Sequence, residues 1–245
     1  HQGSMSRTSL PLSPRNAGAI LSRTLIATFL AVAALVWAFV ELADEVVEGS
    51  TRALDEALLL AMRSPFDSAD PLGPSWLEEI ARDCTALGGV AVLTLLVFAV
   101  TGFLWLTGQR RSALFLLAVV AGGLAVSTGF KEFFARPRPD LVTHGSHVYT
   151  ASFPSGHSLM AAMTYLTLAM MLARTQPRRR VKLYLLSIAV TATILVGLSR
   201  VYLGVHWPSD VLAGWTLGAA WALLAWALAR FLERRGELEP ETDEG

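Results

Sequence analysis

Long apolar stretches without a charged side chain recur along this 245-residue chain. A helix that crosses a bilayer needs roughly 20 such residues, within a range of about 17 to 25. Stretches that reach this length with their flanking residues are 24–40, 84–109, 112–130, 158–173, 183–199 and 211–229. A helix of a soluble protein would carry polar residues along one face, with a period of 3.6 residues. These stretches have few polar residues in such a pattern. The pattern predicts an all-α integral membrane protein, a bundle of six transmembrane helices.

The composition is typical of a membrane protein and argues against some classes of binding partner and site. Hydrophobic residues make up 53% of the chain and charged residues 16%, below the quarter that is usual for soluble domains. The formal net charge is zero, so nothing indicates a nucleic-acid partner. The single cysteine, Cys84, excludes an intramolecular disulfide and a cysteine metal cluster. We expect it to be a small buried hydrophobic residue.

Lysine and arginine residues are concentrated in alternate connections between the predicted helices, which predicts the orientation in the membrane. They gather in residues 5–23, 110–111, 174–182 and 230–235. Because cytoplasmic loops carry the excess of basic residues, both termini are expected in the cytoplasm. Residues 1–4 are interpreted as a cloning remnant and 5–23 as a cytoplasmic tail. The membrane domain is then 24–232, and 233–245 is expected to be an acidic, disordered tail.

The first outer connection, residues 44–83, is not featureless. Leu54, Leu58 and Met62 form an apolar stripe with helical spacing, which predicts a short amphipathic helix on the membrane surface. Ser75 and Glu78 have the spacing of a capping box at the start of a further helix. The segment is either a packed surface hairpin or a lid over a site that lipids can reach.

Three polar clusters follow at the outer ends of the later helices, and the first is KEFFARPRPD, residues 131–140. Pro137 and Pro139 are expected to end the third helix because proline has no backbone donor. Lys131, Arg136 and Arg138 are then left near the water boundary. Taken alone, such a cluster could be a basic membrane anchor.

The second cluster is FPSGHS, residues 153–158. It opens the fourth predicted helix, where unpaired backbone N–H groups form an anion site. Ser155 and Gly156 suit this position, and a glycine lets a ligand approach the backbone closely. His157 falls in the first helical turn. On its own, a histidine at a helix start is usually only a surface residue.

The third cluster is SRVYLGVHWPSD, residues 199–210. Arg200 lies at the end of the fifth predicted helix, and Pro208 suits the first turn of the sixth. Asp210 follows His206 by four positions, so that its carboxylate can reach the imidazole and fix its tautomer. Taken alone, this pair is as readily structural as catalytic.

Together the clusters indicate phosphate chemistry. Arginine and lysine match the oxygens of a phosphate, and a helix start adds backbone donors. The sequence shows neither a carboxylate cluster for a hard cation nor a histidine–cysteine set for zinc. We therefore expect metal-independent phosphoryl transfer without a cofactor. His206, which Asp210 can orient, is the better nucleophile, and His157 is the better general acid.

In order and spacing, the clusters resemble the signature of the type 2 phosphatidic acid phosphatase family, which is related in fold to vanadium haloperoxidases. That signature is K-x6-R-P, then P-S-G-H, then S-R-x5-H-x3-D, and residues 131–139, 154–157 and 199–210 match it throughout. The resemblance implies catalytic roles for His206, His157 and Asp210. It also implies phosphate contacts from the remaining signature residues, which are Lys131, Arg138, Ser155, Gly156 and Arg200.

The family resemblance leaves several alternatives open. It implies a lipid phosphate phosphatase at the outer face of a bacterial cytoplasmic membrane, acting on phosphatidic acid, phosphatidylglycerol phosphate or undecaprenyl pyrophosphate. A lipid phosphotransferase and, less favoured, an anion transporter are the rival functions. Arg136 is either a second phosphate contact or a headgroup anchor. His144 and His147 are expected to be loop residues, with headgroup contact as the alternative. The oligomeric state is not predicted.

Overall fold

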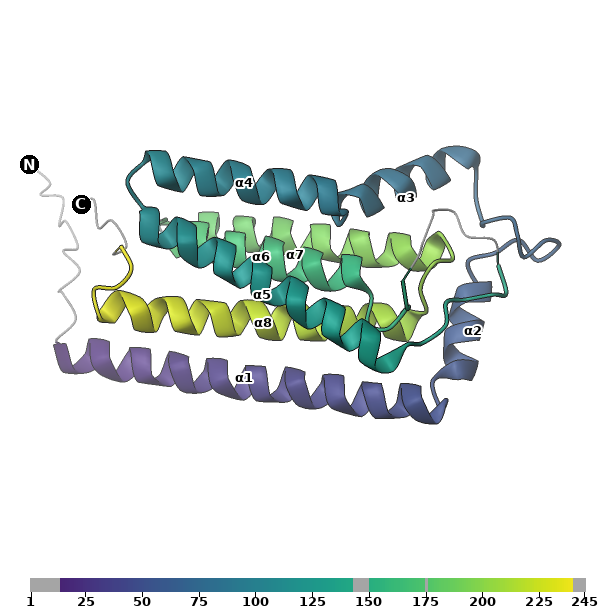
Figure 1. Cartoon of the computed structure of the whole chain (residues 1–245), viewed down its shortest axis with the longest axis horizontal. Coiled ribbons are helices and arrows are strands. Elements are labelled where there is room, and N and C mark those ends of the chain that lie inside the picture. The colour runs from purple at the N-terminus through teal and green to yellow at the C-terminus, as the bar shows by residue number, and fades with distance from the viewer. Residues whose placement is uncertain (1–13, 143–149, 175, 240–245) are drawn as a thin grey trace, which may run out of the picture.

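A computed structural model describes residues 14–142, 150–174 and 176–239 of the chain (Figure 1). Apart from one isolated bridge between Arg63 and Pro71, the regular structure of these residues is helical. The helices are α1 (Pro14–Glu48), α2 (Arg52–Leu60), α3 (Ser75–Leu87), α4 (Val90–Leu106), α5 (Arg110–Phe134), α6 (Gly156–Arg174), α7 (Arg179–Tyr202) and α8 (Pro208–Arg234).

The long helices account for the predicted membrane spans. Within the described residues, α1, α5, α6, α7 and α8 are each long and apolar enough to cross a bilayer. Helices α3 and α4 pass the same test together, but they are bent by 45° at the break between them. Counting this bent pair as one span gives the six spans that the apolar pattern predicts. The all-α membrane architecture is thus confirmed.

The bend between α3 and α4 falls at Gly88 and has a packing reason. A Cβ atom on Gly88 would lie 2.4 Å from Cγ1 of Val196 and 3.2 Å from the backbone oxygen of His157. Only glycine allows the chain to pass so close to α6 and α7. The bend turns α3 against α7, so that α3 forms part of the wall beside the start of α6.

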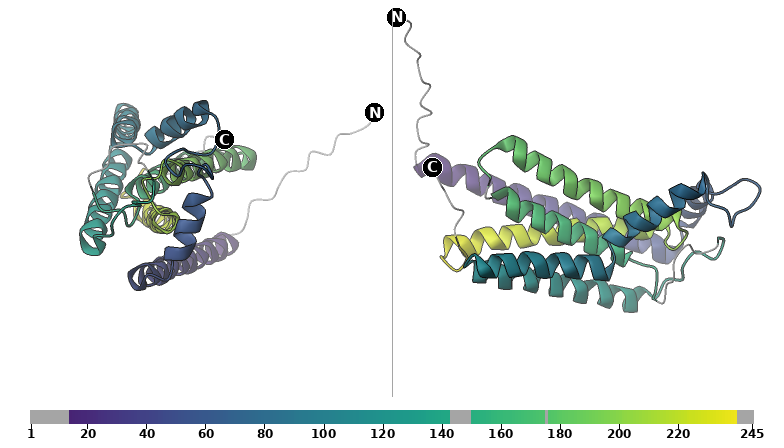
Figure 2. Two further views of the ribbon diagram at one scale, coloured as in Figure 1. Left: turned by 90° about the vertical axis from the view of Figure 1, so that its right-hand side faces the viewer. Right: turned by 90° about the horizontal axis from the view of Figure 1, so that it is seen from above.

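Helices α6 and α8 form the centre of the bundle through small residues. Seen end-on, α8 lies in the middle, with α1 packed on it (Figure 2). Cβ atoms on Gly214 and Gly218 would lie 2.8 Å from the Ser155 oxygen and 2.6 Å from the Leu159 oxygen. Small residues four positions apart let helix backbones approach closely in membranes. This close packing brings the starts of α6 and α8 together.

Helix α2, the short helix that the spacing of Leu54 and Leu58 predicts, crosses the end of the bundle (Figure 1). The side of α2 that packs against the protein differs from the side that carries Leu54 and Leu58. Leu54 and Leu58 are exposed, whereas Asp55 and Leu59 are buried. Leu54 and Leu58 therefore face away from the protein, as expected for a helix on a membrane surface, whereas Met62, the third residue of the stripe, packs against the buried cluster around Leu59. The opposite side of α2 delivers a carboxylate to the interior.

The connection from α2 to α3 is a packed hairpin. Nη2 of Arg63 donates to the backbone oxygen of Tyr202 at 2.9 Å, and the Tyr202 hydroxyl donates to the oxygen of Leu72 at 3.1 Å. These bonds favour the hairpin over a lid. The predicted capping box at Ser75 is wrong. Pro74 is the residue before the first turn of α3, and no side chain caps that turn.

The start of α1 and the end of α8 lie at the end of the bundle opposite to α2 (Figure 1). Part of the acidic segment expected to be disordered is packed there. Glu239 accepts hydrogen bonds from the backbone N–H groups of Arg111 and Ser112, both at 2.9 Å. Its carboxylate thereby binds the exposed donors at the start of α5. Leu238 is buried beside it.

Candidate active site

The three polar clusters of the sequence meet at the α2 end of the bundle. The first cluster follows α5, which ends at Phe134 because Ala135 adopts a left-handed conformation (φ 44°). Its N–H donates to the Lys131 oxygen, a common helix termination. The next residues run as an extended segment, and Ser152 ties it down by donating its N–H to the oxygen of Arg136 at 2.9 Å. Arg136 and Arg138 are thus carried across the start of α8.

The third cluster is built around the start of α8. Pro208 is the first residue of the helix, as predicted, and Trp207 precedes it. The Asp210 carboxylate accepts the N–H of Trp207 at 2.9 Å, which closes the first turn. Asp210 is fully buried, and only 1% of the His206 surface is exposed. Helix formation therefore fixes the carboxylate beside the histidine.

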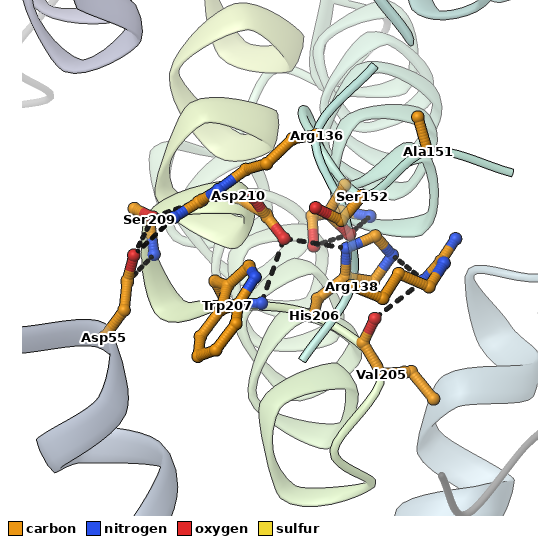
Figure 3. Close-up of polar contacts among 12 residues, drawn as sticks. Asp55, Arg136, Arg138, Ala151, Ser152, Val205, His206, Trp207, Ser209 and Asp210 are labelled. Carbon is orange, nitrogen blue, oxygen red and sulfur yellow. Dashed lines mark hydrogen bonds and ion pairs between the residues drawn. The ribbon is translucent and has the colours of Figure 1, made fainter. Parts of the chain in front are cut away.

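The hydrogen bonds of His206 define its tautomer. Its Nδ1 lies 3.3 Å from Oδ2 of Asp210, and its Nε2 lies 3.1 Å from Nη1 of Arg138 (Figure 3). Arginine can only donate, so Nε2 is the acceptor and carries a lone pair. The proton then sits on Nδ1 and points at the carboxylate. A neutral imidazole in this tautomer has the form that a nucleophile at Nε2 requires.

The electrostatic surroundings favour the neutral imidazole. Burial lowers the pKa of His206 well below its usual value, and the positive charges of Arg138, Arg200 and Lys131 act in the same direction. Burial also lowers the pKa of Arg138, against the opposing effect of Asp210. An arginine remains cationic at neutral pH after such a change. The site therefore presents fixed positive charge around an uncharged nitrogen base.

The cations are held by neutral partners. Nζ of Lys131 donates to the Ala151 oxygen at 2.8 Å, and Nη1 of Arg138 donates to the Val205 oxygen at 2.7 Å. Nη1 of Arg200 donates to Oγ1 of Thr85 at 3.0 Å. Within the described residues, the buried Nε of Arg200 has no hydrogen-bond partner. A buried donor of this kind needs a partner, and an anion could supply it.

A cavity of about 790 Å³ brings most of the predicted site residues together. Those that line it are Lys131, Arg138, Gly156, His157, Arg200 and His206. The other walls come largely from apolar side chains of α4 and α5, including Leu93, Val97, Leu117 and Val120. A Cβ on Gly156 would lie 3.1 Å from Cε of Lys131, so the glycine leaves room for this lysine, and the predicted approach of a ligand to its backbone stays a prediction. The cavity thus joins a cationic end to an apolar interior.

Two predicted residues lie behind the cavity wall. Asp210 contacts the cavity only through His206. Ser155 is fully buried, its N–H donates to the Asp210 backbone oxygen at 2.9 Å, and its Oγ lies 3.0 Å from Oγ of Ser158. The structure does not bring Ser155 to the cavity, and its phosphate contact remains a prediction. His144 and His147 lie outside the described residues.

Arg136 lies with neither the phosphate-binding candidates nor the exposed surface. Its Nη1 donates to Oδ1 of Asp210 at 2.6 Å, and its Nη2 donates to Oδ2 of Asp55 at 2.8 Å. Asp55 is a functional candidate that the motifs do not reveal. The only sequence signal is an acidic residue four positions before Leu59, on the face of α2 away from the exposed stripe.

Among the described residues, no group of three or more histidine, cysteine, aspartate or glutamate side chains could hold a metal ion. The independence from metals stays a prediction. The donors of this site can bind an anion, because lysine and arginine nitrogens and a helix start lie around a histidine base.

Comparison with known proteins agrees with this chemistry. Residues 112–234 match the sequence profile of the family described as PAP2 superfamily. Phosphatidylglycerophosphatase B of Bacillus subtilis is 32% identical over 186 residues, which cover 74% of this chain and 85% of that protein. The undecaprenyl-diphosphatase of Sulfolobus acidocaldarius is 33% identical over 110 residues, 43% of this chain and 47% of that protein.

A solved structure extends the comparison to the fold. The transmembrane PAP2-type phosphatidylglycerolphosphate phosphatase from Bacillus subtilis superposes with a TM-score of 0.72 at 31% identity, covering 83% of this chain and 98% of that chain. Fold, site and relatives define the class as a helical integral membrane phosphatase. More particularly, the chain belongs to the PAP2 superfamily. The predicted family and enzyme class are confirmed.

Proposed function

We propose that the protein removes a terminal phosphate from a membrane lipid without a metal ion, through a phosphohistidine on His206. The observation that carries the proposal is the cavity. Nε2 of His206, which accepts from Arg138 at 3.1 Å, opens into the same space as Lys131 and Arg200. Positive charge at the point where a phosphoryl group gains negative charge is the main source of catalysis in such reactions.

In the first step, Nε2 of His206 attacks phosphorus in line with the leaving oxygen. The bond from phosphorus to the lipid oxygen breaks, and that oxygen takes a proton from His157. A phosphorylated imidazole with a proton on Nδ1 is cationic. Asp210, 3.3 Å from Nδ1, stabilises this charge. The lipid alcohol, or the lipid monophosphate from a diphosphate, then leaves.

In the second step, water attacks the phosphorus of the phosphohistidine. His157, now neutral, takes a proton from that water. The bond from phosphorus to Nε2 breaks, its electron pair returns to the imidazole, and inorganic phosphate is released.

The proposed substrate class follows from the apolar part of the cavity. Apolar walls formed by α4, α5 and α6 suit lipid tails, while the cationic end suits the phosphate. The relatives are named for phosphatidylglycerophosphate and for undecaprenyl diphosphate, so both a phosphomonoester and a diphosphate are candidate head groups. We further propose a bacterial cytoplasmic membrane, from the Bacillus subtilis relatives. The distribution of lysine and arginine supports an orientation with the site at the outer face and both termini inside.

The experiment is phosphate release by purified protein in detergent with EDTA present. A panel of phosphatidic acid, phosphatidylglycerol phosphate and undecaprenyl pyrophosphate tests the head group. We expect turnover by the wild type and none above background by His206→Ala. Arg179→Ala is the matched control, because it removes an exposed charge at the opposite end of the bundle and should keep full activity.

Each rival function has its own result in this experiment. Turnover that EDTA abolishes and magnesium restores would contradict the metal-free mechanism. Transfer of phosphate to a second lipid, without free phosphate, would identify a phosphotransferase. Movement of labelled anion into liposomes without hydrolysis would identify a transporter. Activity retained by His206→Ala would remove the nucleophile from the proposal.

A further inference from the structure

A buried chain of charged groups connects the surface helix α2 to Asp210. Asp55 of α2 accepts three bonds: the N–H of Ser209 at 2.9 Å, the Ser209 hydroxyl at 2.6 Å and Nη2 of Arg136 at 2.8 Å. The other terminal nitrogen of Arg136 donates to Oδ1 of Asp210 at 2.6 Å (Figure 3). One guanidinium therefore bridges two carboxylates from distant parts of the chain.

The two carboxylates of this chain of charged groups are buried, so each depends on Arg136 for its counter-charge. The Asp210 side chain is 0% exposed, that of Asp55 3% and that of Arg136 12%. A carboxylate taken out of water without a compensating charge and hydrogen bonds is strongly disfavoured. Within the described residues, Arg136 is the cation paired with both carboxylates. Removing it would leave two buried carboxylates without their shared counter-charge.

The bridge also determines how Asp210 meets His206. Arg136 binds Oδ1, which leaves Oδ2 to accept the N–H of Trp207 at 2.9 Å and to face Nδ1 of His206 at 3.3 Å. The carboxylate is thus fixed at both oxygens and cannot rotate away from the imidazole. The guanidinium of Arg136 further lies 5.7 Å from the centre of the Trp207 ring, which holds it from another side.

Asp55 owes its place to tertiary packing and not to the phosphatase signature. It lies outside residues 112–234, which match the family. Leu59 of the same helix is buried against Trp207 and Val211, so the packing of α2 presses its inner side onto the start of α8. Arg136 likewise lies between the signature positions Lys131 and Arg138 without being one of them.

We propose that Arg136 and Asp55 are positioning residues for the phosphatase reaction: Arg136 holds Asp210 aligned with Nδ1 of His206, and Asp55, supplied by α2, holds Arg136 and the start of α8. Neither residue lines the cavity, so neither is expected to touch the lipid or its phosphate. This inference rests on the function proposed above, because it assigns roles within that same reaction.

The first test is the effect of Arg136→Gln on kcat and KM separately. A misaligned nucleophile lowers kcat, and a displacement of about 1 Å costs on the order of 100-fold. We expect a fall of that size with KM changed by less than about threefold, because the cavity is untouched. Arg136→Lys keeps a charge but not the two-point fork, so it should recover part of kcat.

The second test asks whether Asp55 acts through Arg136. Asp55→Asn should lower kcat about tenfold, an effect typical of a residue that orients a reacting group. The double variant Asp55→Asn, Arg136→Gln should be no slower than Arg136→Gln alone, because residues acting as one unit are not additive. Glu56→Gln is the matched control: Glu56 is the next residue on α2, it pairs with the exposed Arg52, and its substitution should leave kcat unchanged.

Folding is monitored by the melting temperature and by the active-site titre from the phosphoenzyme burst, and kcat is referred to that titre. The proposal is overturned if Arg136→Gln keeps the wild-type kcat. It is equally overturned if the loss of kcat in this variant disappears once the rate is divided by the number of active sites. It is also overturned if the fold losses in kcat caused by Asp55→Asn and Arg136→Gln multiply in the double variant. Failure of the proposed function gives a different result: the wild type then releases no phosphate, or His206→Ala matches it.

Discussion

Nη1 of Arg138 lies 3.1 Å from Nε2 of His206, on the side of the imidazole away from Asp210. The same nitrogen also donates to the Val205 backbone oxygen at 2.7 Å. One guanidinium therefore marks the lone pair of the proposed nucleophile and lines the cavity that would receive the phosphate. When a phosphoryl group enters, its oxygens can replace Nε2 as acceptor without a large movement of Arg138.

Arg138→Gln should lower kcat/KM by about 100- to 1000-fold, the loss typical of removing a donor to a developing negative charge. Arg138→Lys should recover only part of it, since lysine lacks the planar fork that contacts several acceptors. Initial rates over a range of substrate concentrations measure this, with Arg179→Gln as the control. Full activity of Arg138→Lys would mean that positive charge alone suffices.

The tautomer of His206 can be observed directly by 15N NMR of histidine-labelled protein in detergent. Burial and the surrounding cations lower the pKa of His206, so the ring should remain neutral as the pH falls through 6.5, where an ordinary histidine gains its proton. The proton should reside on Nδ1. His206→Gln identifies the signal by its disappearance. A ring half protonated near pH 6.5, or one protonated on Nε2, would contradict this electrostatic description.

The same pKa makes a prediction for stability, with a definite sign. The unfolded chain takes up a proton on His206 near pH 6.5, whereas the folded chain does so only at lower pH. Stability from this group is therefore present above pH 6.5 and lost as the pH falls below it. Melting temperatures of wild type and His206→Gln should converge between pH 7 and pH 5. Parallel curves would contradict the prediction.

The apolar part of the cavity should be needed for lipids only. Ala121 lines it from α5, and Ala121→Trp would fill part of the space. We expect KM for a long-chain lipid phosphate to rise about tenfold or more, because buried apolar area is lost. Hydrolysis of water-soluble p-nitrophenyl phosphate should be unchanged. Ala118→Trp, exposed on the same helix and outside the cavity lining, is the control. Equal effects on both substrates would contradict a tail site.

The contact between α6 and α8 predicts a stability effect. A Cβ on Gly218 would lie 2.6 Å from the Leu159 oxygen, so Gly218→Ala should destabilise the protein by about 1–3 kcal/mol through overpacking. Gly102 in α4 has nothing within 4 Å of its Cβ position, so Gly102→Ala should be neutral or stabilising by up to about 1 kcal/mol. Thermal melts of both variants measure the difference, and equal melting temperatures would contradict it.

Much of the fold and site could be predicted because the signals are local. Charge-free stretches near the thickness of a bilayer predict the spans, and proline and glycine predict where α6 and α8 begin. The spacing of His206 and Asp210 is a property of one helix start. Lys131, Arg138 and Arg200 can be identified as candidates from the sequence, because their positive charges follow apolar helices on the side of the membrane where basic residues are otherwise few.

The remaining features depend on tertiary packing. The bend at Gly88 follows from its contact with Val196 and His157, which no local pattern encodes. Asp55 has the sequence context of an exposed charge on an amphipathic helix. It is buried because α2 packs its polar side onto α8, while Leu54 and Leu58 face outward. Ser155 fits the signature, yet its N–H is taken by the Asp210 backbone oxygen.

The most direct test is to identify the phosphorylated atom. Rapid mixing of the protein with 32P-labelled phosphatidylglycerol phosphate, an alkaline quench and separation of the phosphohistidine isomers would locate the label. We predict phosphate on Nε2 of His206, because Nδ1 faces Asp210 at 3.3 Å. Phosphate on Nδ1 or on another residue, or turnover of labelled lipid with no phosphoenzyme at any time, would contradict the proposed mechanism.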